Sequence, residues 1–224
     1  MKKLFAAIRK REINEVSKIL NNRPELVNCV AGKTPKKDEG QSPLQVAIKT
    51  ENNDIAKLLI ERGADVRYME TGDNDEWRRP VLHFAVSAVT LNARFGIYVP
   101  KYSSQNTTGK DYWKTINKPT STYLSCLEIL KLIISKGAET NCSNNYGVNT
   151  LEVLCSHIVQ DKIIEDLKAL REESIKDIYP MLKLLKATDK SDFEKSSVRG
   201  NTIYYHYKDI IEQLIGNKPT HNKA

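Results

Sequence analysis

The sequence predicts an all-α fold in which pairs of short helices repeat along the chain. A unit of turn, helix, turn and helix occupies residues 40–66, and parts of it return before and after that stretch. Within the copies, apolar residues recur at spacings of three and four, the period of one helix face. Residues that start or stop helices stand at the ends of these apolar segments. A chain of 224 residues can bury a core either as one large domain or as a short array of repeats with caps.

Residues 40–66 form the clearest unit. Ser42 can cap a first helix that begins at Pro43, because a proline there lacks only an N–H that has no partner within the helix. A second helix can start at residues 53–54, and Gly63 can end it in the left-handed conformation that glycine adopts without strain. The apolar face of this second helix consists of Ile55, Leu58 and Leu59.

Parts of the same unit occur at four other places. Before it, two apolar helical segments lack the preceding turn, as expected of a first repeat with no earlier neighbour. After it, one copy is interrupted by a long insertion, the next has a clear first half, and the last stops after one helix. These copies lie at residues 4–28, 80–141, 147–185 and 200–215.

The unit resembles the ankyrin repeat, in which Gly-x-Thr-Pro-Leu-His-x-Ala precedes a Leu-Leu pair and Gly-Ala-Asp over about 33 residues. Residues 40–48 read GQSPLQVAI, and residues 80–86 read PVLHFAV, with proline and valine where the family has threonine and proline. The resemblance implies a solenoid of about four to five helix-turn-helix repeats with lengthened finger loops and two insertions inside repeats. It also implies that His83, at the family's histidine position, orders its turn by hydrogen bonding.

The resemblance divides residues 1–224 into one domain of five units. Loops between ankyrin repeats project as fingers, whereas connections within a repeat emerge at the opposite edge. We therefore expect longer fingers at residues 29–39 and 67–79 and two insertions on the other edge. The units are an N-terminal cap repeat (1–39), repeat 2 (40–78), repeat 3 (79–146, insertion 90–123), repeat 4 (147–190, helical insertion 159–176) and a degenerate C-terminal cap (191–224).

One continuous core is expected between the repeats, because equivalent positions of successive copies are apolar. Replacing one of these leucines, such as Leu58, by alanine is expected to cost about 2 to 5 kcal/mol of stability. The expected core residues are Leu44, Ala47, Leu58, Leu59, Leu82, Ala85, Leu130, Ile133, Leu151 and Leu154.

The sequence carries no recognisable catalytic, metal or nucleotide motif. The four cysteines lie far apart without a Cys-x-x-Cys pair, and the four histidines form no His-Glu-x-x-His motif. No serine stands in a Gly-x-Ser-x-Gly turn. Residues 32–34 look like the end of a phosphate-binding loop, but Val27 stands where that loop needs its first glycine. We therefore expect a protein that is not an enzyme and uses no cofactor.

The formal net charge of +7 makes nucleic acid a partner to be considered. Positive charge concentrates in residues 1–37 and 94–118, two separate patches instead of one stripe with interleaved aromatics. Nucleic acid is therefore disfavoured and kept as the alternative from another class. No segment approaches the roughly 20 apolar residues of a membrane span, and the first residues lack the apolar centre of a signal peptide. We expect a cytoplasmic protein without membrane contact, and the oligomeric state stays open.

Another protein is the expected partner, because a solenoid presents an extended concave face instead of an enclosed pocket. An apolar stripe that includes Val46, Phe84 and Val153 is expected to point into this groove, beside a fingertip carrying Trp77. Alternatively, the fingers or the insertion fold over Phe84 and bury it. We favour the groove over the insertion at 90–123, since a preformed surface loses less entropy on binding. The candidate partner-binding residues are Val46, Lys49, Tyr68, Trp77, Arg78, Arg79, Phe84 and Val153.

Binding itself is the expected output, because the repeats take up most of the chain. An inhibitor, an immunity or antitoxin-type protein, or an adaptor would each work in this way. Small free-standing ankyrin proteins of bacteria and their phages are similar in organisation. A host-directed effector is the alternative within the same class.

Overall fold

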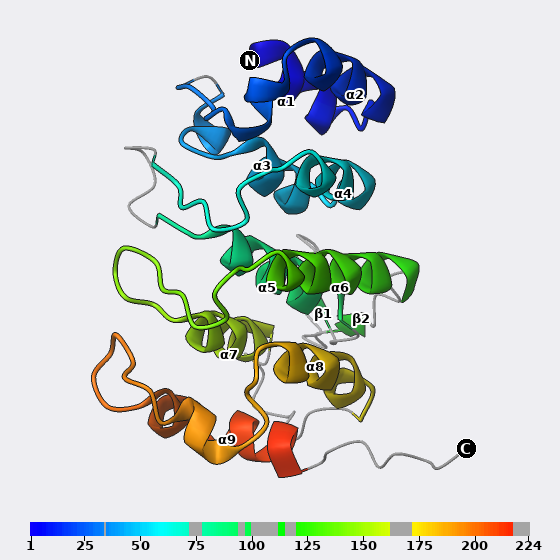
Figure 1. The fold of residues 1–224 in the computed structure, drawn as a ribbon. Helices are drawn as coiled ribbons and strands as arrows, with labels where there is room; N and C mark the ends of the chain where they lie inside the picture. The colour runs from blue at the N-terminus through cyan, green and yellow to red at the C-terminus, as the bar shows by residue number, and fades with distance from the viewer. Residues whose placement is uncertain are drawn as a thin grey trace, which may run out of the picture.

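The computed structural model describes residues 1–33, 35–71, 78–93, 97–99, 112–114, 120–161 and 172–216. Helix pairs stack from the N-terminus to the C-terminus (Figure 1). The inner layer contains α1 (Lys2–Arg9), α3 (Pro43–Lys49), α5 (Val81–Asn92), α7 (Thr150–Asp161) and α9 (Ile203–Gly216). The outer layer contains α2 (Ile13–Asn22), α4 (Asn53–Glu61), α6 (Thr120–Ser135) and α8 (Glu172–Leu184). Neighbouring helices of each layer pack on one another, which confirms the predicted all-α solenoid.

The turn into α3 forms as its sequence predicts. Ser42 Oγ accepts a hydrogen bond from the backbone N–H of Gln45 at 3.2 Å, and Gln45 Oε1 accepts one from the backbone N–H of Ser42 at 2.9 Å. This reciprocal capping box satisfies two N–H groups at the start of α3, and Pro43 occupies the first helical position. α4 begins at Asn53, and Gly63 follows its end with a φ of 87°.

A single apolar core runs through the stacked helices. All of the expected core residues except Leu58 are buried. Leu58 is half-buried and packs at the edge of the core, whereas its neighbour Leu59 is fully buried. Adjacent residues of a helix point about 100° apart, so only one of this leucine pair can face the centre of the core.

Four hairpin fingers project from the stack on the same side (Figure 1). Finger 1 (residues 31–41) is closed by hydrogen bonds between Ala31 and residues 40–41. Finger 2 (69–80), finger 3 (143–149) and finger 4 (196–202) are each closed by an isolated β-bridge between their end residues. Three short 3-10 helices lie in the connections: η1 (Pro24–Asn28), η2 (Lys36–Asp38) and η3 (Lys190–Phe193).

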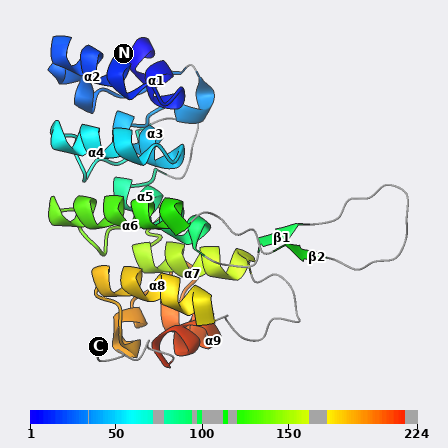
Figure 2. The same cartoon turned by 90° about the vertical axis from the view of Figure 1, so that its right-hand side faces the viewer.

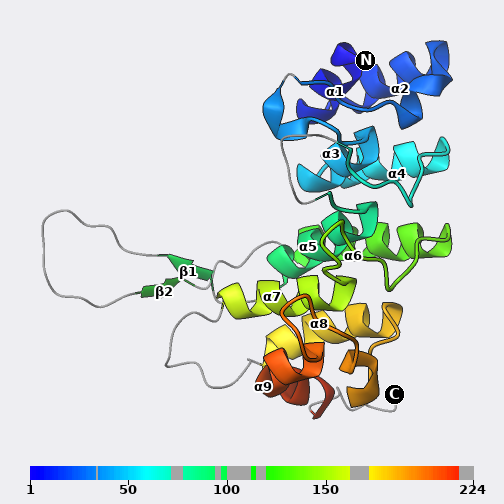
Figure 3. The ribbon, with the colours of Figure 1, turned by 90° about the vertical axis from the view of Figure 1, so that its left-hand side faces the viewer.

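The insertion of repeat 3 is shorter than expected at both ends. α5 continues to Asn92, and within its last turn Thr90 is fully buried, with its hydroxyl donating to the carbonyl of Val86 at 2.8 Å. α6 begins at Thr120, which places the buried Tyr123 within the helix. Within the insertion, β1 (Ile97–Val99) and β2 (Tyr112–Lys114) pair antiparallel. Figures 2 and 3 show this hairpin standing out from the side of the stack.

The helix expected within residues 159–176 falls largely on residues 162–171, which lie outside the described part of the chain. The described ends of that range belong to α7 and α8. α9 packs on both α7 and α8, and no partner helix follows it within the described residues. We propose that it closes the stack as a C-terminal cap.

Candidate binding groove

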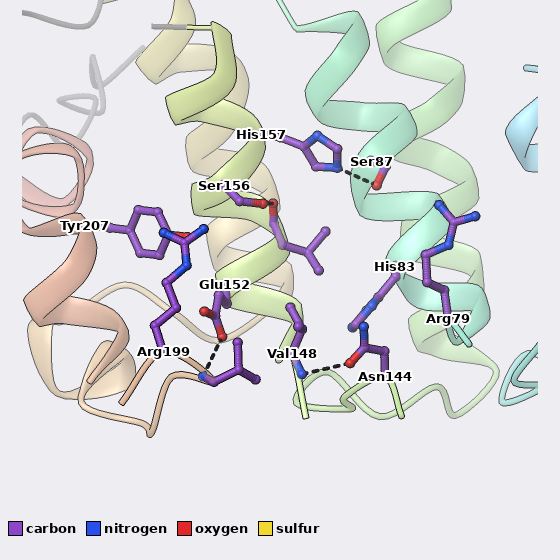
Figure 4. A pocket seen from close by; sticks show the side chains of 12 residues that line it. Arg79, His83, Ser87, Asn144, Val148, Glu152, Ser156, His157, Arg199 and Tyr207 are labelled. Atoms are coloured by element: carbon purple, nitrogen blue, oxygen red, sulfur yellow. Dashed lines mark hydrogen bonds between the residues drawn. The ribbon is translucent and has the colours of Figure 1, made fainter. Parts of the chain in front are cut away.

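A groove of about 400 Å³ opens on the inner layer between α5, α7 and α9, beside fingers 3 and 4 (Figure 4). The inner-layer helices form the floor of the groove, and the fingers form its rim. The lining residues are Arg79, His83, Ser87, Asn144, Val148, Glu152, Val153, Ser156, His157, Val198, Arg199 and Tyr207.

Arg79 stands at the rim, immediately before α5. Its guanidinium lies 4.4 Å from the ring centroid of Phe84, and its Nε lies 3.2 Å from Oε2 of the buried Glu70. Phe84 is only 5% exposed, and Val46 is fully buried. Val46 and Phe84 therefore do not form the open apolar stripe that was expected. Instead, Arg79 at the end of finger 2 covers Phe84, as in the alternative prediction. Val153 is half-buried and does line the groove.

His83 links α5 to the base of finger 3. Its Nε2 lies 3.3 Å from the carbonyl oxygen of Cys142, so this nitrogen carries the hydrogen and donates it. Burial lowers the pKa of His83 to about 4, so the ring is neutral at pH 7. This contact is the turn-ordering role that the resemblance implied.

The equivalent residues of the neighbouring repeats make equivalent links. Gln45 of α3 donates from Nε2 to the carbonyl of Arg79 in finger 2 at 2.9 Å. Glu152 of α7 accepts from the hydroxyl of Ser197 at 2.7 Å and from the backbone N–H of Val198 at 3.5 Å, both in finger 4. Each first helix is thereby tied to the finger that follows it, although only one of the three repeats uses histidine.

His157 and Ser87 meet across the floor of the groove. His157 Nε2 of α7 lies 2.8 Å from Ser87 Oγ of α5. Burial, reinforced by the charge of Arg79, lowers the pKa of His157. A serine beside a neutral histidine is also the start of an acyl-transfer site, but such a site needs N–H donors aimed at a developing oxyanion. Ser87 lies inside α5, where backbone N–H groups are used within the helix, so the pair fits binding better than catalysis.

Arg199 and Tyr207 form the far wall of the groove (Figure 4). The exposed Arg199 guanidinium lies 5.9 Å from the ring centroid of the buried Tyr207. Burial raises the pKa of Tyr207, so its hydroxyl stays protonated at pH 7. Glu152 is only 2% exposed and already bonded to finger 4. The charge that this wall presents to solvent is therefore positive.

Large apolar side chains are exposed on three successive fingers. Met69 is 37% exposed, Tyr146 is 49% exposed and Val198 is 46% exposed. A side chain added at Gly147 would meet Val198 at 3.6 Å, so the tips of fingers 3 and 4 lie side by side. Of these side chains, Tyr146 and Val198 extend the rim of the groove with an apolar surface.

The residues expected to bind a partner divide into four groups. Arg79 and Val153 line the groove, and Arg78 is exposed beside it. Val46 and Phe84 are buried. Lys49 Nζ lies 2.9 Å from Asp38 Oδ1 and donates to Gln41 Oε1 at 2.6 Å. The hydroxyl of Tyr68 donates to the carbonyl of Gly40 at 2.8 Å. Lys49 and Tyr68 therefore stabilise the first two fingers. Trp77 lies outside the described residues.

Residues one turn further along the inner helices were not predicted as binding residues. Ser87 follows His83 by four positions and His157 follows Val153 by four positions, so each shares a helix face with a residue singled out from the repeat pattern. This four-residue spacing is the sequence feature that could have identified Ser87 and His157 as groove residues. Arg199 had no such signal, because its place in the groove depends on how finger 4 folds back toward α7.

Among the described residues, no group of three or more His, Cys, Asp or Glu side chains is arranged to hold a metal ion. Within the same residues, no helix combines the length and apolar character needed to cross a membrane.

Comparison with known proteins agrees with the stacked helix pairs. The family model of the ankyrin repeat matches residues 39–70, the stretch that contains α3, α4 and the start of finger 2. No curated protein matches the chain. The chain therefore contains an ankyrin repeat at residues 39–70, set within an all-α solenoid of stacked helix pairs.

Proposed function

We propose that the chain is a non-catalytic protein-binding module whose partner occupies the groove and the tips of fingers 3 and 4. Ankyrin repeats are in general protein–protein interaction modules. The observation that carries the proposal is the groove of about 400 Å³, which is already open beside the exposed Tyr146 and Val198.

The chemistry of this surface supports a protein partner. Tyrosine and arginine are the residue types that most often dominate the energy of protein interfaces, and here both stand at the rim of one groove. The links from Gln45, His83 and Glu152 hold the fingers on the inner helices. A surface held in this way loses little entropy when a partner docks.

We further propose that binding is itself the output, as in an inhibitor, an immunity or antitoxin-type protein, or an adaptor. The stacked helix pairs and their fingers account for most of the described residues. An inhibitor would cover the working surface of its partner, so the activity of the captured partner should fall when this chain is added. An adaptor would leave that activity unchanged.

Site-specific photocrosslinking in an extract of the native cells tests the groove. A benzophenone amino acid replaces Tyr146 at the tip of finger 3 or, as the matched control, Leu124 on α6, which is 51% exposed. We expect one discrete protein adduct from position 146 and none from position 124. Adducts from position 124 alone, or from neither position, would contradict the proposed binding face.

A further inference from the structure

The groove has a consistent charge pattern. Its lining holds two guanidinium groups, those of Arg79 and Arg199, and one carboxylate, that of Glu152. The carboxylate is enclosed by finger 4, where Ser197 and the backbone of Val198 donate to it. Glu152 is therefore part of the scaffold. Arg79 is already paired with Glu70, so Arg199 sets the charge that an incoming group meets.

Arg199 is held in place without an ion pair among the described contacts. It stands at the tip of finger 4, exposed, with its guanidinium 5.9 Å from the ring centroid of Tyr207. A guanidinium presents a planar fork of N–H donors that matches a carboxylate and can bind it through two parallel hydrogen bonds. Here that fork is held by an aromatic ring at the edge of a preformed groove.

Arg79 and Arg199 stand at opposite ends of the groove (Figure 4). Stacking on Phe84 at 4.4 Å and the contact of its Nε with Glu70 fix the guanidinium at the rim. Its charge reaches into the groove, since it is one of the causes that lower the pKa of both His83 and His157.

The floor between the arginines is polar but uncharged. His83 and His157 are both buried enough to have a lowered pKa, and Ser87 and Ser156 contribute hydroxyl groups. Because the floor adds no negative charge, Arg199 at the rim is the cation nearest to an anion that enters this end of the groove.

We propose that the groove takes an acidic segment of the partner protein, with a carboxylate on Arg199 and a neighbouring apolar side chain on Tyr146 and Val198. The inference rests on the proposed protein-binding function and specifies the chemistry of the partner. The exposed apolar fingertips favour a peptide over nucleic acid, because a phosphate backbone offers no apolar side chain to cover them.

Fluorescence anisotropy with defined probes tests this assignment on the full chain. The probes are a labelled capped hexaglutamate, a labelled capped hexaglutamine and a labelled single-stranded DNA 12-mer. The variants are Arg199→Glu and, as the matched control, Lys57→Glu, which makes the same charge change at an exposed position of the outer helix α4. Thermal melts of both variants check that the fold is retained.

We expect hexaglutamate to bind and hexaglutamine not to bind. Arg199→Glu should weaken hexaglutamate binding by at least about tenfold, the loss of one charge-assisted contact, whereas Lys57→Glu should change it less than about twofold. Equal losses in both variants would show attraction by net charge alone and overturn the proposal. Absence of hexaglutamate binding, or DNA binding that is tighter and equally sensitive to Arg199, would overturn it as well. Any of these results would leave the protein-binding function standing if position 146 still crosslinks to a protein.

Discussion

Asp38 anchors a chain of polar contacts beneath the first two fingers. Its carboxylate is 1% exposed, pairs with Arg9 of α1 and lies 2.9 Å from Nζ of Lys49 in α3. Lys49 also donates to Gln41 Oε1 at 2.6 Å, and Gln41 donates to Glu70 Oε1 at 2.6 Å. A continuous polar path thus links α1, α3 and fingers 1 and 2.

Replacing Asp38 by asparagine should destabilise the chain by about 3 kcal/mol or more, because it leaves Arg9 and Lys49 without their carboxylate in a site that water enters poorly. Urea denaturation at pH 7 measures the loss. The control is Glu25→Gln, which removes an exposed acid that pairs with Arg23 at 2.9 Å. The control should unfold close to wild type. A midpoint for Asp38→Asn equal to that of the control would show that the network adds no stability.

His83 should make stability depend on pH. Its pKa is about 4 in the folded chain against 6.5 for an ordinary histidine, so between these values the unfolded chain binds a proton that the folded chain does not. The free energy of unfolding should therefore fall as the pH is lowered from 7 to 4, by up to about 3 kcal/mol from this residue. Urea titrations at pH 7, 6, 5 and 4 should show a shallower decline for His83→Gln than for wild type. Parallel declines would mean that His83 is protonated equally in both states.

At the scale of elements, the repeat at residues 40–66 was predictable because its signals are local. A serine cap, a proline after it and a glycine at the end of the second helix each act on their own turn. The pattern also identified the Leu58–Leu59 pair, but it could not say which of the two faces the centre, because that depends on how α4 is rotated against α2 and α6.

Leu59→Ala should cost about 2 to 5 kcal/mol, since Leu59 is fully buried between helices of the outer layer. Leu58→Ala should cost clearly less, because Leu58 keeps part of its surface in water. Chemical denaturation of both variants provides the comparison, with each serving as the control for the other. A larger loss at Leu58 would mean that the register of α4 is misassigned.

The features that the sequence could not supply depend on distant segments. Phe84 is covered by Arg79 because finger 2 returns onto α5, and a repeat pattern carries no information on that return. His157 meets Ser87 across 70 positions of the chain. Glu152 stands where the family has histidine, and its link to finger 4 becomes visible only once that finger is placed. The core and helix order were therefore predictable, whereas most of the groove was not.

At the scale of the whole molecule, the stack separates two surfaces. The fingers and inner helices form one face, on which the groove opens beside fingers 3 and 4 (Figures 1 and 4). The β1–β2 hairpin stands out from a different side of the stack than the fingers (Figures 1, 2 and 3). The open groove with arginine at its rim supports the proposal that the partner binds there and not on the insertion.

Hydrogen–deuterium exchange of the chain with its crosslinked partner, after that partner is identified, tests the groove as the binding face. We expect slower exchange on binding at the backbone amides of residues 144–148 and 196–200, where the fingers border the groove. Amides of the outer helices α2 and α4 should exchange as in the free chain. Slowed exchange confined to residues 90–123 or to the outer layer, with both fingers unchanged, would contradict the groove as the binding face.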